Sequence, residues 1–130
     1  MSAALVEGTA GVIAAAVRSG AVSAREIAQE TLNRIEARNG ALGAFTKVTA
    51  KRALAKADAI DTARARGGNL GPLAGAPFAV KNLFDVQGLT TRAGSKINRD
   101  RPPSKADATV IARLEAAGGV LVGEIGRAHV

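Results

Sequence analysis

The stretch Ala76-Pro-Phe-Ala-Val-Lys-Asn-Leu-Phe84 decides the fold of this 130-residue chain. It is a mostly apolar run of strand length, and its proline stands at the start, where a strand tolerates one. After a long loop, residues 104–117 have helical spacing, and Val120-Leu-Val122 forms a second, fully apolar strand. Strand, helix and strand predict a βαβ unit whose strands lie parallel, and therefore an α/β fold.

Three helical segments are expected before this unit, so residues 1–68 are predicted to be helical and residues 69–123 to begin the sheet. The second and third segments start at residues that can cap a first turn, Ser23 and Thr49. The expected segments are Thr9–Ser19 closed by Gly20, a helix from the capping box Ser23-Ala-Arg-Glu26 to Asn39-Gly40, and a helix from Thr49 to Gly67-Gly68. A second capping box, Ser104-Lys-Ala-Asp107, is expected to start the helix of the βαβ unit.

Two strands do not make a finished sheet, because parallel strands need neighbours and helices on both faces. We expect the strand at residues 120–122 to be uncovered and the chain as written to be poorly stable. The sequence has three aromatic residues, Phe45, Phe78 and Phe84, which leaves a thin core.

Composition narrows the class of protein. Apolar residues make up 47% and charged residues 22%, which is typical of a globular protein. Cysteine is absent and His129 is the only histidine, so we expect no disulfide, no cysteine nucleophile, no metal site and no cofactor. The start of the chain resembles no signal peptide and no apolar run has transmembrane length, so a cytoplasmic protein with no membrane association is expected.

The net charge of +7 favours an anionic partner, or indicates that an acidic remainder of the protein is absent. The basic residues of one loop, Arg92, Lys96, Arg99, Arg101 and Lys105, could steer a carboxylate substrate, contact nucleic acid or simply be solvated. Nucleic acid is the weaker expectation, because the loop has no aromatic residue on which a base could stack.

Lys81 is the candidate catalytic residue, because it lies inside the apolar run. Apolar surroundings favour the neutral amine, which can act as a general base toward a serine hydroxyl. The alternative is a lysine at a strand end whose ammonium group reaches water. The residues alone leave both interpretations open.

The run Gly71–Val86 resembles the amidase-signature family, and the resemblance continues through residues 88–95, 107–110 and 115–123. The most specific part is a block in which Gly75, Pro77 and Lys81 match a Gly-x-Pro-x-x-x-Lys pattern. Residues 5–123 fit about the first quarter of such a chain. The resemblance implies N-terminal helices followed by the first βαβ unit of a mixed sheet, so residues 1–123 are expected to be part of a single domain.

The resemblance also implies a Ser–cis-Ser–Lys mechanism in which Lys81 is the base. The two serines of the family lie downstream of this chain, so the chain alone is expected to be inactive. Ser95 and Ser104 do not match them, and are expected to be a loop residue and a helix cap. Asn82 stands where the family usually has aspartate.

The implied function is hydrolysis of a C–N amide bond in a small carboxylated amide or urea-like compound, a small-molecule substrate. The resemblance leaves open a homodimer and a small partner subunit in the full-length protein. Two rival hypotheses are a non-catalytic interaction module and a basic RNA-binding domain.

The sequence leaves the family pattern at Glu124. Residues 124–130 fit the codons GAG ATC GGA AGA GCA CAC GTC, which match a common sequencing-library adapter read in frame. We therefore expect residues 124–130 to be a non-native tail and assign His129 no role.

Overall fold

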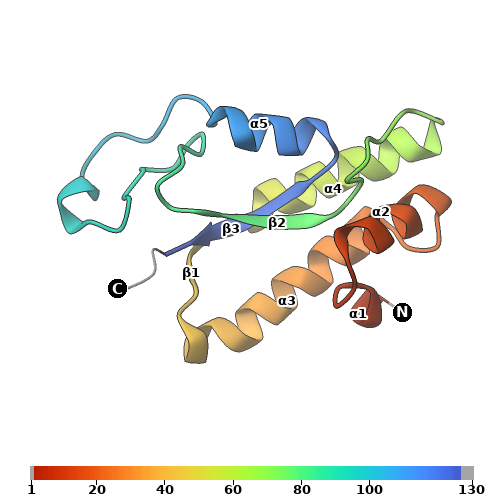
Figure 1. Ribbon diagram of the computed structural model, residues 1–130, viewed down its shortest axis with the longest axis horizontal. Coiled ribbons are helices and arrows are strands. Elements are labelled where there is room, and N and C mark those ends of the chain that lie inside the picture. Colours follow the sequence, from red (N-terminus) through yellow and green to blue (C-terminus); the bar gives the residue numbers. More distant parts are fainter. Residues whose placement is uncertain (1, 127–130) are drawn as a thin grey trace.

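The computed structural model describes residues 2–126 of the chain, as two helical layers around a small sheet (Figure 1). His129 and the rest of residues 127–130 lie outside the described residues. The elements in chain order are α1 (Ser2–Leu5), α2 (Ala10–Ser19), α3 (Ala24–Leu42), β1 (Phe45–Val48), α4 (Ala50–Ala65), β2 (Pro77–Lys81), the 3-10 helix η1 (Lys96–Asn98), α5 (Thr109–Ala116) and β3 (Val120–Ile125).

The predicted βαβ unit is confirmed, and with it the α/β class. Strand β2 pairs in parallel with β3, and α5 forms the connection between them. In the register of this pair, Phe78 lies opposite Leu121 and Lys81 lies opposite Ile125. The last residues of the two strands therefore lie side by side at one end of the sheet.

Strand β1 is an element that the sequence analysis missed, since it lies within the 68 residues expected to be helical. It pairs antiparallel with β3, which makes the sheet mixed and gives the order β1-β3-β2. Close approach of the two strands depends on Gly123, where an added Cβ would lie 2.6 Å from the carbonyl oxygen of Lys47. Strand β1 has only four residues, and most of their side chains are exposed, so its sequence has no clear alternation of buried and exposed residues. Its strand conformation depends on pairing with β3, which is distant in the sequence.

The expectation that residues 120–122 lie uncovered is wrong, because β1 and β2 flank β3 and helices cover both of its faces. Val120 and Val122 belong to a core cluster shared with α2, α3 and α4. Leu121 points to the opposite face and packs with Val80 and with Ile111 of α5. Figure 1 shows α5 on one side of the sheet and α3 on the other.

The capping box predicted at Ser23 is confirmed, and Thr9 is a cap that the sequence analysis did not predict. The Thr9 hydroxyl accepts a hydrogen bond from the Val12 amide at 3.1 Å. Ser23 and Glu26 form the reciprocal capping box, in which each side chain accepts from the backbone amide of the other at 3.0 Å. No helix among residues 2–126 is long and apolar enough to cross a membrane.

Three other expectations about helix ends are wrong, and in each case a longer-range contact competes. Helix α3 continues past Asn39 to Leu42 and ends at Gly43, which has a left-handed backbone and donates to the carbonyl of Asn39, while the Asn39 side chain binds the backbone of Phe45. Thr49 stands at the start of α4, but its hydroxyl donates to the carbonyl of Leu121 at 2.8 Å.

The capping box predicted at Ser104 and Asp107 is absent, because α5 begins only at Thr109. Ser104 instead forms a hydrogen bond between hydroxyl groups with Thr91 at 3.0 Å. Asp107 binds the guanidinium group of Arg52, so both polar side chains fasten the preceding loop rather than the helix.

Candidate functional site

Lys81 is the last residue of β2, and its side chain is exposed among the described residues. Strand alternation explains this placement, because Val80 and Asn82 turn into the structure on one face while Lys81 points to the other. The apolar neighbours in sequence therefore do not cover the ammonium group within residues 2–126. Within the described residues, the ammonium group of Lys81 therefore reaches water, as expected for a lysine at a strand end.

A cavity of about 630 Å³ opens beside the ends of β2 and β3, between β1 and the loop at residues 88–103. Its polar lining includes Lys47, Asn82, Arg92, Ser95, Lys96 and Glu124. Ligands of open α/β sheets bind in the crevice outside the carboxyl ends of the strands, and this cavity has that location. Lys81 and its strand partner Ile125 are each adjacent in sequence to a residue of the cavity lining: Asn82 follows Lys81, and Glu124 precedes Ile125.

Hydrogen bonds from the loop backbone hold Arg92 at the cavity. The amide of Ala93 donates to the carbonyl of Asn82 at 3.1 Å, which ties the loop to the end of β2. The carbonyl of Arg92 accepts from the Ser95 amide at 3.0 Å and from the Asn98 side chain at 2.9 Å. Ser95 therefore acts within the loop, as expected, and its hydroxyl also accepts from Ile97 at the start of η1.

Two buried polar side chains line the cavity without a complete set of partners. Asn82 and Glu124 are each only 5% exposed. Asn82 Oδ1 and Glu124 Oε1 have no hydrogen-bond partner among the described residues. Burial raises the pKa of the Glu124 carboxyl, and the positive charges of Arg92 and Lys47 offset part of that effect.

The sequence analysis missed Asn82 as a site residue, although the pattern to find it is present. A period of two from Phe78 through Val80 places Asn82 on the buried face of β2. Lys47 lay outside the prediction for a different reason, because it enters the cavity only through the antiparallel pairing of β1.

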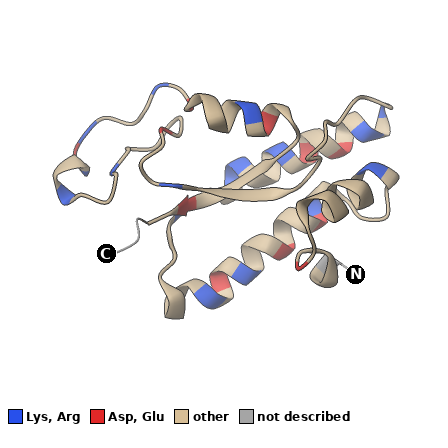
Figure 2. Cartoon of the chain, in the orientation of Figure 1, with Lys and Arg blue, Asp and Glu red and all other residues tan. Residues whose placement is uncertain are grey.

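The basic loop divides into two groups. Arg92 and Lys96 line the cavity, whereas Arg99, Arg101 and Lys105 are exposed outside its lining. Figure 2 shows the basic residues distributed along the loop and several helices rather than confined to one segment. Only the first group can contact a ligand in the cavity.

A separate charged cluster joins α4 to α5. The guanidinium group of Arg52 binds both carboxylate oxygens of Asp107, at 2.9 and 2.7 Å, and also binds Glu115. These hydrogen bonds hold the pKa of Asp107 below its ordinary value, and the pKa of Arg52 above its own. Every charged group of the cluster has a partner, so its role is structural.

Comparison with known proteins connects this geometry with a family. A family model described as Amidase matches residues 26–125, which include most of α3, all of α4, the βαβ unit and the cavity lining. The chain belongs to the amidase family. The resemblance to amidase-signature enzymes is thereby confirmed, and solved structures of that group share the fold.

Two curated relatives and one solved structure show how far the similarity extends. The AtzE subunit of 1-carboxybiuret hydrolase from Pseudomonas sp. (strain ADP) is 58% identical over 107 residues, which cover 82% of this chain and 23% of that protein. A glutamyl-tRNA(Gln) amidotransferase subunit from Chromohalobacter salexigens is 46% identical over 112 residues, covering 86% of this chain and 23% of that protein.

An inhibitor-bound complex of an s-triazine catabolic enzyme, described as a vestigial protein complex, superposes with a TM-score of 0.88. Its sequence is 54% identical, and the match covers 90% of this chain and 26% of that one. This chain thus spans about a quarter of the length of the proteins that it matches.

Proposed function

We propose that this chain is the N-terminal part of an amidase-signature hydrolase that cleaves a C–N amide bond of a small carboxylated amide or urea-like compound. The observation that carries the proposal is the position of Lys81, which lies within the matched family segment at the carboxyl end of β2 and is followed in the chain by Asn82 of the cavity lining. The relative named 1-carboxybiuret hydrolase supports a urea-like substrate that bears a carboxylate.

In the proposed mechanism Lys81 is the general base. Its neutral amine accepts a proton from a bridging serine, which takes one in turn from the nucleophilic serine. The nucleophile attacks the amide carbonyl, the C–N bond breaks, and the departing nitrogen receives the proton. Water then hydrolyses the acyl-enzyme. Both serines belong to the downstream part of the family's sequence, and this part would also cover the exposed Lys81.

The test uses the complete protein, expressed from the full reading frame. Lys81→Arg keeps a positive charge that is not lost at neutral pH, so it should fail as a base almost as completely as Lys81→Ala. We expect both variants to lose about two to four orders of magnitude in kcat for release of ammonia from a carboxylated amide.

Lys105→Arg is the matched control, because Lys105 is exposed and outside the cavity lining. It should keep activity within about twofold, as surface substitutions usually do. Activity of Lys81→Arg close to that of the control would show that Lys81 is structural and would overturn the mechanism. The 130-residue chain by itself should release no ammonia, since it supplies the base without the two serines.

We also propose that residues 1–123 are part of one amidase-signature domain and that residues 124–130 are not native. The buried carboxylate of Glu124, with an oxygen lacking a partner, supports this, because native proteins seldom leave such a group unpaired. Strand β3 and the family match both continue to residue 125, so the boundary falls inside a regular element. Sequencing the locus from an amplified genomic fragment tests the proposal, and recovery of codons 124–130 in the genomic sequence would refute it.

The two curated relatives are both named as subunits, which supports a partner subunit for the complete protein. Light scattering of that protein, purified alone and after co-expression with the neighbouring genes, would detect a small partner or a homodimer. A monomer under both conditions would contradict this part of the proposal.

A further inference from the structure

We infer that Arg92 and Asn82 together recognise the two ends of the substrate in the cavity, with Arg92 binding its carboxylate and Asn82 accepting a hydrogen bond from an amide N–H. This inference rests on the proposed function, and it assigns the specificity for an acid-bearing amide to two residues of this chain. It uses the side chains at the cavity and does not depend on the role of Lys81 as a base.

The charge of the cavity favours an anion. Three cationic side chains, Lys47, Arg92 and Lys96, line it against the single carboxylate of Glu124. None of the three cations has an ion-pair partner within 4.0 Å in the part of the chain that the structure describes. A cavity with this balance attracts a small carboxylate, and its low-dielectric walls strengthen the attraction.

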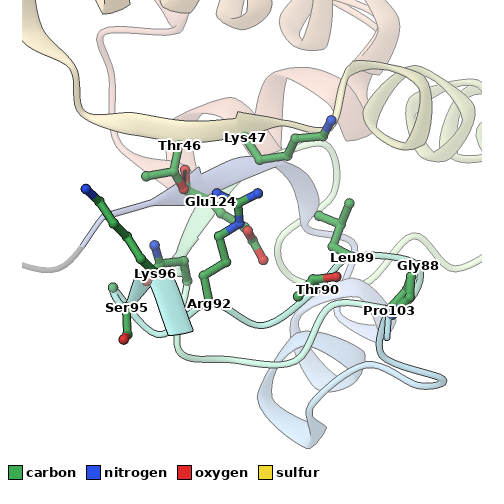
Figure 3. Close-up of a pocket in the computed structure, with 12 residues that line it drawn as sticks. Thr46, Lys47, Gly88, Leu89, Thr90, Arg92, Ser95, Lys96, Pro103 and Glu124 are labelled. Atoms are coloured by element: carbon green, nitrogen blue, oxygen red, sulfur yellow. Dashed lines mark hydrogen bonds between the residues drawn. The ribbon is translucent and has the colours of Figure 1, made fainter. Parts of the chain in front are cut away.

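Arg92 is the cation best placed to bind that carboxylate. Figure 3 shows its side chain extending from the loop toward Glu124, while the side chains of Lys47 and Lys96 extend in different directions. The guanidinium group presents paired N–H donors that match the two oxygens of a carboxylate. Two backbone hydrogen bonds and one from the Asn98 side chain hold the backbone at Arg92 and Ala93, so little ordering of the loop is needed on binding.

Asn82 supplies the complementary acceptor. Its side chain is 5% exposed and lines the cavity, and its Oδ1 has no donor among the described residues. A buried acceptor without a partner is unfavourable, so a ligand N–H that reaches it gains a hydrogen bond and removes the penalty. The amide nitrogen of the proposed substrate is such a donor.

A backbone hydrogen bond ties the loop that carries Arg92 to Asn82. The Ala93 amide binds the Asn82 carbonyl, so the residue after Arg92 is tied to the end of β2. Because both residues line the same cavity, we expect a small compound that carries both a carboxylate and an amide to contact the two side chains. Glu124 is not needed for this arrangement, because neither of the two contacts uses its carboxylate.

The test compares two substrates that differ in one charge, malonamate and malonamide, on the complete protein. We expect Arg92→Gln to lower kcat/KM for malonamate by about 10- to 100-fold, the effect of losing a charge-assisted hydrogen bond. Malonamide should change by less than about threefold. Added salt should weaken binding of malonamate by the wild type and not that of malonamide.

Arg99→Gln is the matched control, since the Arg99 side chain is 63% exposed and lies outside the cavity lining. It should leave kcat/KM for both substrates within about twofold. Asn82→Asp keeps an acceptor and adds a negative charge, so it should impair malonamate more than malonamide. Equal losses on the two substrates in Arg92→Gln would overturn the inference.

Calorimetric binding of malonate separates this inference from the proposed function, because malonate has no amide to hydrolyse. If the complete protein hydrolyses neither amide but binds malonate, and Arg92→Gln weakens that binding by about tenfold, recognition of the acid stands while the hydrolase proposal fails. If malonate binds equally to wild type, Arg92→Gln and Arg99→Gln, the acid site is wrong whatever the enzyme hydrolyses.

Discussion

The helical layer of α2, α3 and α4 and the segment at residues 82–108 are built on different principles. In the helical layer, buried residues such as Val17, Ile27 and Ala57 join one continuous apolar cluster. In the segment, Val86 is a buried anchor, and single hydrogen bonds such as Thr91–Ser104 and Asn98–Arg92 do most of the fastening. Burial stabilises the first region and polar contacts shape the second, which is the region that forms most of the cavity.

The same substitution in each region measures this difference, and it has the largest expected effect. Ile27 is fully buried in α3, whereas Ile97 in η1 is 86% exposed. Ile27→Ala should lower the free energy of unfolding by about 2–5 kcal/mol, because it leaves a cavity that the helices cannot fill. Ile97→Ala should change it by less than about 0.5 kcal/mol.

Urea unfolding of the 130-residue chain, followed by circular dichroism, measures both values. Equal effects would contradict the comparison, because they would mean that Ile97 is covered in solution. Failure of Ile27→Ala to fold would agree with it, since a chain with so small a core has little stability to lose.

A second test concerns Arg52, the residue that joins the two regions. Arg52→Ala leaves Asp107 and Glu115 without their cation, and should cost about 2–3 kcal/mol of unfolding free energy. Arg25→Ala is the control, because its ion pair with Asp58 has side chains 51% and 56% exposed. An exposed pair of this kind contributes less than about 1 kcal/mol.

The contribution of Arg52 should also depend on pH in one direction. The pKa of Asp107 is lowered from its ordinary value of 3.8 in the folded chain, mainly by its hydrogen bonds with Arg52. The stabilisation is therefore complete above pH 3.8 and is lost as the pH falls through the lowered pKa. The difference between wild type and Arg52→Ala should shrink below that pH, and a constant difference would show that Asp107 is not the partner that matters.

The same contrast explains what the sequence could predict. The capping box at Ser23 and the βαβ unit follow from residues close together in the chain, so local patterns sufficed. Ser104 and Asp107 have the spacing of a capping box, but their partners Thr91 and Arg52 lie 13 and 55 positions away. Local spacing carries no information about such competitors.

The site follows the same division. Lys81 was predicted from a family pattern, and its location at the end of β2 follows from the strand. The apolar neighbours of Lys81 in the sequence suggested that it is buried, but it is exposed. Side chains alternate along the strand, so Val80 and Asn82 point inward and Lys81 points outward. Lys47 and Glu124 reach the cavity through the pairing of β1 with β3, which no local pattern encodes.

The smallest expected effect, and one with an unusual sign, is at Glu124, where the two regions meet. Burial raises the pKa of this carboxyl above its ordinary value of 4.5, so the charged form destabilises the fold. The penalty is absent at pH values below 4.5 and develops as the pH rises through the raised pKa. Glu124→Gln keeps the shape and removes the charge, and should therefore raise the unfolding free energy at pH 7 by about 1 kcal/mol, with little change at low pH.

Glu36→Gln, on the exposed face of α3, should have no such effect. Urea unfolding at the two pH values decides the matter: a loss of stability in Glu124→Gln at pH 7 would mean that Arg92 or Lys47 already pairs with the carboxylate, and the cavity would then hold one cation fewer for a ligand.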